Sequence, residues 1–145
     1  MASSRPPGTK NLLSALKEFG ARKLVLVSSI AVYAYDRIPP YSVIDEDSPV
    51  VDGQVGANVY ATMKRRQKLL VESYASNANL ATVSLRPGLV YDSKRLEPGH
   101  AGIVRGGIGV VIKNDARVPV AQVEGLAKAI IDSGAHDDGS CRPCL

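Results

Sequence analysis

Three stretches of the chain carry apolar residues at helical spacing, and each ends near a glycine or an asparagine. They predict helices from Gly8 to about Phe19, from about Asn58 to Asn77 and from about Ala121 to Ser133. Gly20 and Gly134 follow the first and third of these stretches, where a helix commonly ends. The predicted inward residues are Leu12, Leu13, Leu16 and Phe19 in the first helix and Met63, Leu70, Val71 and Tyr74 in the second.

Two short apolar runs predict strands. Leu24–Val27 is a continuous apolar run before Ser28-Ser29, as expected for a strand buried on both faces of a parallel sheet. Leu80–Leu85 is the second predicted strand, and Arg86-Pro87-Gly88 ends it. The order helix, strand, loop, helix, strand indicates an α/β fold with a parallel sheet and right-handed crossovers.

Two regions have weaker periodicity. Ala34–Ala57 contains several prolines and glycines and predicts a long loop, and a loop of this length inside a compact domain usually has a function. Ala101–Ile112 is rich in glycine and favours a short strand with a turn. Val118-Pro119-Val120 then leads into the last predicted helix.

Composition places the chain among ordinary globular proteins. Its 145 residues suffice for one compact domain, and 45% are hydrophobic and 22% charged. No apolar run approaches about 18 residues, so no membrane span is expected. The N-terminus has no apolar segment of a secretion signal, which favours a cytoplasmic location, with mitochondrion or plastid as the alternative.

Charge and cysteines add little chemistry. Much of the net charge of +4 comes from Lys64–Lys68, and the chain has only six tyrosines and one phenylalanine for base stacking, so nucleic-acid binding is disfavoured. Cys141 and Cys144 lack the second pair that a structural zinc site needs, and no metal site is predicted. Residues 135–145 are expected to form a disordered tail.

Three local features fall where ligands bind in parallel sheets. Ser28-Ser29 and Arg86-Pro87-Gly88 each follow a predicted strand, and ligands bind outside the carboxyl ends of such strands. Tyr60 and Lys64 begin the second helix and share one face of it, because they are four residues apart. Taken singly, each feature is more often structural: a serine pair forms a turn, and Tyr60 or Lys64 is a surface residue. Their order and positions together favour a site.

The chemistry of such a site follows from a phenol beside an ammonium. A tyrosine pKa near about 10 is too high for a base at neutral pH, and a nearby ammonium can lower it by about 1–3 units. Lys64 would thereby bring Tyr60 into the range of general acid/base catalysis. Ser29 would hold the substrate oxygen, and a nicotinamide would carry the hydride, since no side chain can do so.

Four segments resemble the extended short-chain dehydrogenases/reductases, the group of NAD-dependent epimerases and dehydratases. The resemblance covers about Gly8 to Ser133 and includes the catalytic Y-x-x-x-K at Tyr60 and Lys64. The matching segments are Gly8–Leu13, Ser28–Tyr33, the acidic loop Asp45–Pro49, and Arg86–Tyr91.

The resemblance implies an α/β fold, an incomplete Rossmann-like, doubly wound parallel sheet with flanking helices. Residues 8–92 would form a partial NAD(P)-binding domain after an irregular segment 1–7, and residues 93–134 a short remnant of the substrate domain. The catalytic residues would be Ser29, Tyr60 and Lys64. The NAD or NADP cofactor would be bound by Ser28, Tyr60, Lys64, Pro87, Gly88, Leu89 and Val90.

The sequence also departs from the pattern of that family. No G-x-x-G-x-x-G follows an N-terminal strand, so the pyrophosphate lacks its usual helix N-terminus. We therefore expect a truncated NAD(P)-dependent epimerase/dehydratase or reductase that binds cofactor weakly and is inactive by itself. The alternative is a non-catalytic accessory or scaffold protein of the same fold. The expected partners are a small-molecule substrate (a nucleotide sugar or another carbonyl or hydroxyl compound) and a second copy or the missing N-terminal half, which would cover the exposed edge of Leu24–Val27.

Overall fold

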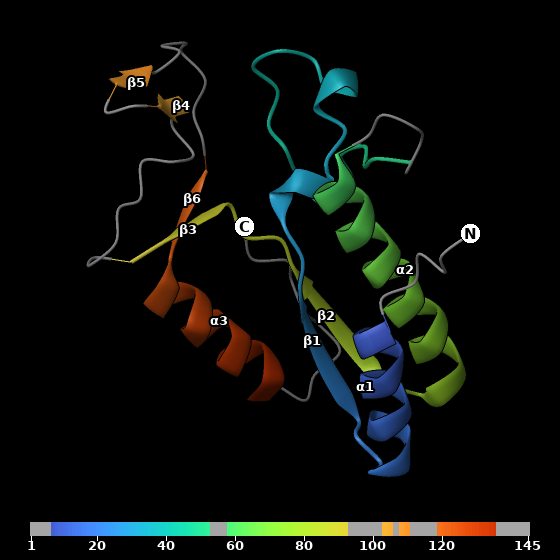
Figure 1. Cartoon of the computed structure of the whole chain (residues 1–145). Helices are drawn as coiled ribbons and strands as arrows, with labels where there is room; N and C mark the ends of the chain where they lie inside the picture. Colours follow the sequence, from blue (N-terminus) through green and yellow to red (C-terminus); the bar gives the residue numbers. More distant parts are fainter. Residues whose placement is uncertain (1–6, 53–57, 93–102, 106–107, 111–118, 136–145) are drawn as a thin grey trace.

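A computed structural model describes residues 7–52, 58–92, 103–105, 108–110 and 119–135. Within these residues the chain forms helices and strands in alternating order (Figure 1). The elements are α1 (Pro7–Glu18), β1 (Lys23–Val27), the 3-10 helices η1 (Ile30–Val32) and η2 (Tyr35–Arg37), α2 (Val59–Ala78), β2 (Ala81–Leu85), β3 (Leu89–Tyr91), β4 (Ile103–Arg105), β5 (Ile108–Val110), β6 (Val120–Gln122) and α3 (Val123–Ala135).

Strands β1 and β2 form a parallel pair. Lys23 lies opposite Ala81, and the register continues to Val27 opposite Leu85. The ladder continues one residue past β1, because the Ser28 amide donates to the Leu85 carbonyl at 2.7 Å. The predicted parallel α/β arrangement of these two strands is confirmed.

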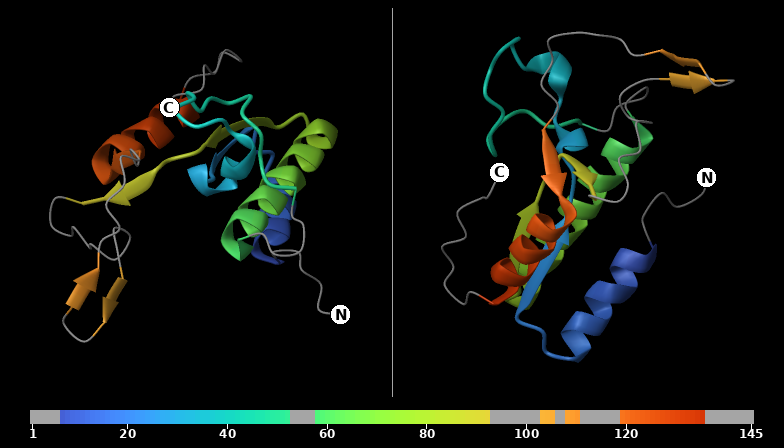
Figure 2. Two further views of the ribbon diagram at one scale, coloured as in Figure 1. Left: turned by 90° about the horizontal axis from the view of Figure 1, so that it is seen from above. Right: turned by 90° about the vertical axis from the view of Figure 1, so that its left-hand side faces the viewer.

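Helices cover both faces of the β1–β2 pair. Helices α1 and α2 lie on one face and α3 on the other (Figures 1 and 2). On the first face Leu13 of α1, Leu26 of β1 and Val71 of α2 form a core cluster. Neighbouring residues of a strand point to opposite faces, so Val27 and its partner Leu85 face α3.

The ends of α1 and α2 follow from local chemistry. Gly20 has φ of +64°, a left-handed conformation that suits glycine, and the Ala21 amide donates to the Leu16 carbonyl to close the end of α1. Asn58 caps α2, since its side-chain oxygen accepts from the amides of Tyr60 and Ala61. Asn79 ends α2 in the left-handed region with φ of 50°. Both predicted helices are confirmed to within one residue at each end.

For some residues the predicted inward orientation is wrong, because their side chains are exposed. Leu12 is 50% exposed, Phe19 83% and Met63 54%, whereas Leu13 and Val71 are buried and Leu70 and Tyr74 pack against the core. Leu12 and Met63 each lie one residue away from the stripe that meets the sheet, a rotation of about 100° around a helix. Phe19 lies beyond the last residue of α1 and therefore has no helix face to share.

A second parallel pair, β3 with β6, was not predicted from the sequence. Leu89 lies opposite Val120, and its amide donates to the Pro119 carbonyl at 2.9 Å. Gly88 packs so closely on this connection that a Cβ placed there would lie 2.1 Å from the Pro119 oxygen. The predicted helix from Ala121 begins instead at Val123, because Val120–Gln122 pairs as β6.

The region from Ile103 to Val110 contains an antiparallel hairpin of β4 and β5. The predicted short strand is confirmed, and the residues between β4 and β5, where the predicted turn would fall, lie outside the described part of the chain. Both views show the hairpin set apart from the β1–β2 pair (Figures 1 and 2).

The long loop after β1 is more ordered than the sequence suggests. It contains η2, and Tyr33 and Val50 form an isolated antiparallel bridge at its base. The Ala34 amide donates to the Pro49 carbonyl at 2.8 Å, and the Val51 amide donates to the Val32 carbonyl at 2.9 Å. Residues 32–52 therefore form a closed excursion from the sheet, which we call the closed loop.

Some predictions fall on residues outside the described part of the chain. These are residues 136–145 of the predicted tail, with Cys141 and Cys144, residues 1–6 of the predicted irregular N-terminus, and residue 93 at the predicted domain boundary. The predicted limits of both terminal segments are wrong by one residue, because Pro7 belongs to α1 and Ala135 to α3. No helix among the described residues is long and apolar enough to cross a membrane.

Candidate functional site

Lys64 ties the second helix to the carboxyl end of β1. Its Nζ donates to the Val27 carbonyl oxygen at 2.9 Å, across a separation of 37 residues. The same Nζ lies 5.8 Å from the centre of the Tyr60 ring, one helical turn earlier. The bond therefore places the Lys64 ammonium at the carbonyl of Val27, two residues before Ser29 in the chain.

Tyr60 lies in the first turn of α2, directly after the Asn58 cap. Its side chain is about half exposed, at 51%, and is not packed into hydrocarbon. The phenol is therefore accessible to a ligand at this end of the sheet. The next residue, Ala61, is buried and anchors the helix at this point.

Ser29 caps the short helix η1, which contacts α2. Its Oγ accepts a hydrogen bond from the Ala31 amide at 3.2 Å. This bond occupies an acceptor site of the hydroxyl and leaves its proton free to be donated to a ligand oxygen. Ser28 beside it is 3% exposed, and its Oγ has no hydrogen-bond partner among the described residues.

The remaining predicted site residues follow β2. The Pro87 carbonyl accepts from the Ile30 amide at 3.1 Å, so this segment lies directly beside the chain that follows Ser29. Gly88 packs on Pro119, and Leu89 and Val90 belong to β3. The structure thus brings Ser28, Lys64 and Pro87 to one end of the β1–β2 pair.

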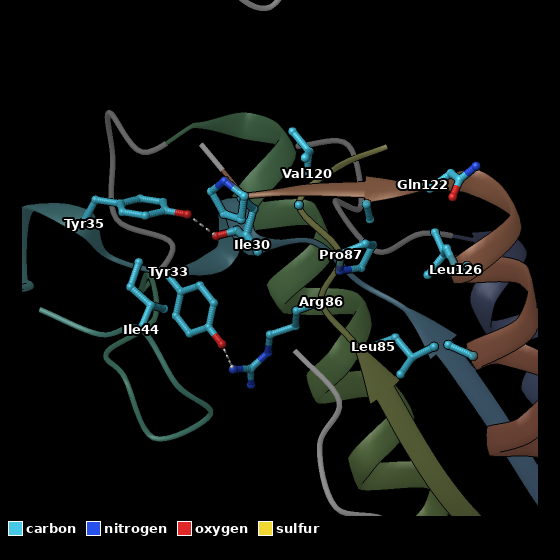
Figure 3. Close-up of a pocket in the computed structure, with 15 residues that line it drawn as sticks. Ile30, Tyr33, Tyr35, Ile44, Leu85, Arg86, Pro87, Val120, Gln122 and Leu126 are labelled. Carbon is cyan, nitrogen blue, oxygen red and sulfur yellow. Dashed lines mark hydrogen bonds between the residues drawn. The ribbon is translucent and has the colours of Figure 1, made fainter. Parts of the chain in front are cut away.

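A pocket of about 650 Å³ lies on the face of the sheet that α3 covers (Figure 3). Pro87 and Gly88 line it, but Ser29, Tyr60 and Lys64 do not. Its walls come from the closed loop, the end of β2, strand β6 and one side of α3. We call this hollow the α3-face pocket.

Arg86 and Tyr33 form a pair at this pocket that the sequence analysis did not single out. The guanidinium lies 5.0 Å from the centre of the Tyr33 ring, and its Nη1 donates to Tyr33 Oη at 2.8 Å and to the Glu46 carbonyl at 3.3 Å. These contacts join the end of β2 to the closed loop. The two residues are 53 positions apart, so no local pattern could have revealed the pair.

Tyr35 completes the aromatic side of the α3-face pocket. Its hydroxyl donates to the Ile30 carbonyl at 3.0 Å, and its ring meets that of Tyr33 edge to face at 6.5 Å. Burial, with a smaller contribution from Tyr33, raises the pKa of Tyr35 above its usual value. Tyr35 therefore stays protonated and acts as a hydrogen-bond donor at neutral pH.

The described residues contain no cluster of three or more histidine, cysteine, aspartate or glutamate side chains that could hold a metal ion. The chemistry that these residues can offer is that of hydroxyl groups, an ammonium and a guanidinium.

Comparison with known proteins identifies the family. Residues 3–119 match the NAD dependent epimerase/dehydratase family. Because this match covers well over half of the chain, the protein belongs to that family. The resemblance inferred from its motifs is confirmed.

Several relatives are sugar-nucleotide epimerases. A UDP-glucuronate 4-epimerase from Thermodesulfobacterium geofontis (strain OPF15) is 36% identical over 67 residues, which are 46% of this chain and 19% of that protein. The structure of a UDP-glucose 4-epimerase from Thermus thermophilus in complex with NAD is 31% identical, with a TM-score of 0.51 over 63% of this chain and 27% of the other.

A third relative supports the fold alone. The UDP-N-acetylglucosamine 4-epimerase from Methanobrevibacter ruminantium M1, in complex with UDP-N-acetylmuramic acid, has a TM-score of 0.65 at 21% identity. The alignment covers 90% of this chain and 43% of that chain. The α/β, Rossmann-like fold is thus confirmed, and this chain spans less than half the length of that relative.

Proposed function

We propose that this chain carries the catalytic segment of an NAD-dependent epimerase that acts on a nucleotide sugar. The observation that carries the proposal is the hydrogen bond from Lys64 to the Val27 carbonyl, which holds the catalytic helix against the strand end that leads into Ser29. Family membership and the UDP-sugar epimerases among its relatives support the reaction and the substrate class.

Three side chains share the proposed chemistry. The Ser29 hydroxyl, whose acceptor side is engaged by the Ala31 amide, donates a hydrogen bond to the sugar oxygen that reacts. Tyr60 removes the proton from that hydroxyl group and later returns it. Lys64 stabilises the phenolate form of Tyr60, which carries the negative charge before it takes the proton and again after it has returned the proton.

The same end of the sheet would hold the nicotinamide part of the cofactor. NAD, when bound, supplies a hydride acceptor and donor. Lys64 Nζ uses one of its three N–H groups on Val27, which leaves two for ribose hydroxyls. The buried Ser28 Oγ lacks a partner among the described residues and is suited to a cofactor oxygen, and the backbone of residues 87–90 would flank the ring.

Cofactor binding is the first test. Calorimetric titration with NAD and with NADP should show binding weaker than micromolar, since the sequence contains no glycine-rich pyrophosphate turn of the usual pattern. Amide signals of Ser28, Tyr60 and Lys64 in NMR spectra should shift on addition of NAD. Lys64→Met should abolish the shifts, while Lys10→Met, at an exposed position of α1, should not.

Turnover is the second test. UDP-glucose, UDP-N-acetylglucosamine and UDP-glucuronate, each with excess NAD, are followed by NMR for the epimeric product. Any turnover should fall at least about 100-fold in Tyr60→Phe, the lower range of general acid/base effects. It should persist in Tyr41→Phe, because Tyr41 is fully exposed. Turnover that survives Tyr60→Phe contradicts the proposal.

The second candidate is a non-catalytic accessory or scaffold protein of the same fold, in a mitochondrial or plastid assembly, whereas the first candidate would be cytoplasmic. The second candidate predicts neither NMR shifts with NAD nor turnover, together with an assembly, such as a homodimer, that Tyr60→Phe leaves intact. Sedimentation of the parent chain and of Tyr60→Phe measures that assembly.

A further inference from the structure

The α3-face pocket is separate from the proposed catalytic groups. Leu126 and Ala129 of α3 line it, and Leu85 reaches it from the face of β2 that is directed towards α3. Lys64 and Tyr60 belong to α2, which covers the opposite face of the sheet (Figure 1). A ligand in this pocket would therefore not contact the catalytic helix.

The pocket has the composition of a small-molecule site. Ligand pockets usually measure about 300–1,000 Å³ and combine apolar walls with a few polar groups, and the α3-face pocket, at about 650 Å³, lies within this range. In Figure 3 the apolar side chains of Leu85, Pro87, Val120 and Leu126 lie along one part of the pocket, and Tyr33, Tyr35 and Arg86 lie at the other.

Arg86 gives the pocket its charge preference. Among the described residues its hydrogen bonds come only from Nη1, so the donors on Nε and Nη2 remain for a ligand. No carboxylate lines the pocket among those residues. A guanidinium at the rim of an apolar hollow, without an acidic partner there, favours an anion, and its planar donors suit a carboxylate, sulfonate or phosphate.

We propose that the α3-face pocket is a second binding site, which takes a small amphipathic anion: an apolar ring system with one negatively charged group. The ring system lies between Leu126 of α3 and the Tyr33 and Tyr35 side, and the charged group pairs with Arg86. This site borders the proposed nicotinamide position at Pro87 and Gly88, but Ser29, Tyr60 and Lys64 do not line it.

The test uses two fluorescent probes that differ in one charged group. 8-Anilinonaphthalene-1-sulfonate carries a sulfonate, and N-phenyl-1-naphthylamine has the same rings without it. Titration of the full chain at a temperature where circular dichroism shows it folded should give one saturable site that prefers the sulfonate. Arg86→Gln should reduce that preference about tenfold or more, as the loss of a hydrogen bond to a charged group implies.

Matched variants separate the pocket from general surface binding. Lys128→Gln removes a cation from an exposed position of α3 and should leave both affinities unchanged, since the Lys128 side chain is 76% exposed. Ala129→Trp places a large side chain in the pocket and should abolish binding of both probes. Arg86→Lys keeps the charge and should retain part of the preference.

Defined results overturn the proposal. An unchanged sulfonate preference in Arg86→Gln, or probe binding that survives Ala129→Trp, would show that the probes bind elsewhere. If Arg86→Gln does not fold, the other two variants test the proposal, because both keep a positive charge at position 86. A sulfonate preference that Arg86→Lys leaves unchanged, or probe binding that Ala129→Trp leaves unchanged, would then overturn it. Lys64→Met should abolish the NMR shifts that NAD causes but should leave the affinity for both probes unchanged. This result would show that the probes and NAD depend on different residues.

Discussion

Gly88 lies close against the backbone of Pro119 in the pocket wall, and its substitution tests the fold at this point. A Cβ at this position would lie 2.1 Å from the Pro119 carbonyl oxygen and 2.6 Å from its carbon, far inside van der Waals contact. Both atoms belong to the backbone, so no side chain can rotate away. Gly88→Ala must therefore displace Pro119 and strain the Leu89–Pro119 hydrogen bond that leads into the β3–β6 pair.

The size of the effect follows from two terms. Overpacking by one carbon typically costs about 1–3 kcal/mol. Loss of the hydrogen bond from the Leu89 amide adds about 0.5–1.5 kcal/mol. Together they lower the free energy of unfolding by about 2–4 kcal/mol, which corresponds to a fall in Tm of about 4–16 °C for a chain of this size.

Thermal and urea unfolding, followed by circular dichroism, measure the difference from the parent chain. Gly134→Ala is the matched control, because a Cβ at Gly134 in α3 meets nothing within 4 Å. In a helix this substitution should raise stability by up to about 1 kcal/mol. If Gly88→Ala and Gly134→Ala have the same free energy of unfolding, Gly88 does not pack as closely on Pro119 as described.

Three further substitutions test the core, a helix cap and a titrating group. Leu13→Ala should lower the free energy of unfolding by about 2–5 kcal/mol, because Leu13 is buried in the core cluster; Leu12→Ala should have a much smaller effect, and equal losses would refute the assigned helix face. Asn58→Ala should destabilise the chain by about 1 kcal/mol through the lost cap of α2, while Asn58→Asp should not, and a neutral alanine variant would contradict the capping role. Because the pKa of Tyr35 is raised in the folded state, the unfolded chain loses this proton first, so stability that is fully present below about pH 10 should fall as the pH rises through and above that value. Urea midpoints between about pH 9 and about pH 11 should show a smaller fall in Tyr35→Phe, and parallel pH profiles would refute this contribution.

The order of the main helices and strands could be predicted because local signals mark each of them. A continuous apolar run indicated β1, and Asn58 and Gly20 lie at helix boundaries where capping chemistry acts within a few residues. The motif of Tyr60 and Lys64 was visible because both residues lie in one helical turn. Such features depend on neighbours in the sequence, so composition and spacing suffice.

The missed features depend on distant partners. Strands β3 and β6 are three residues each, too short for a period-2 pattern, and each is fixed by pairing with the other. The bond from Lys64 to Val27 and the stacking of Arg86 on Tyr33 join segments far apart in the chain. Helix faces were partly wrong because the spacing of Leu12 and Met63 allowed a wider apolar stripe than the sheet covers.

The closed loop has a consequence for how this scaffold can change over time. Its two ends are fastened to each other by the Tyr33–Val50 bridge and by an ion pair between Arg37 and Asp52. Residues between these anchor points can be lengthened or exchanged with little effect on the strands, since doubling a loop costs only about 0.6 kcal/mol in closure entropy. Homologous chains can thus acquire new selectivity by remodelling this excursion, while the sheet beneath it and the fastening at its base stay the same.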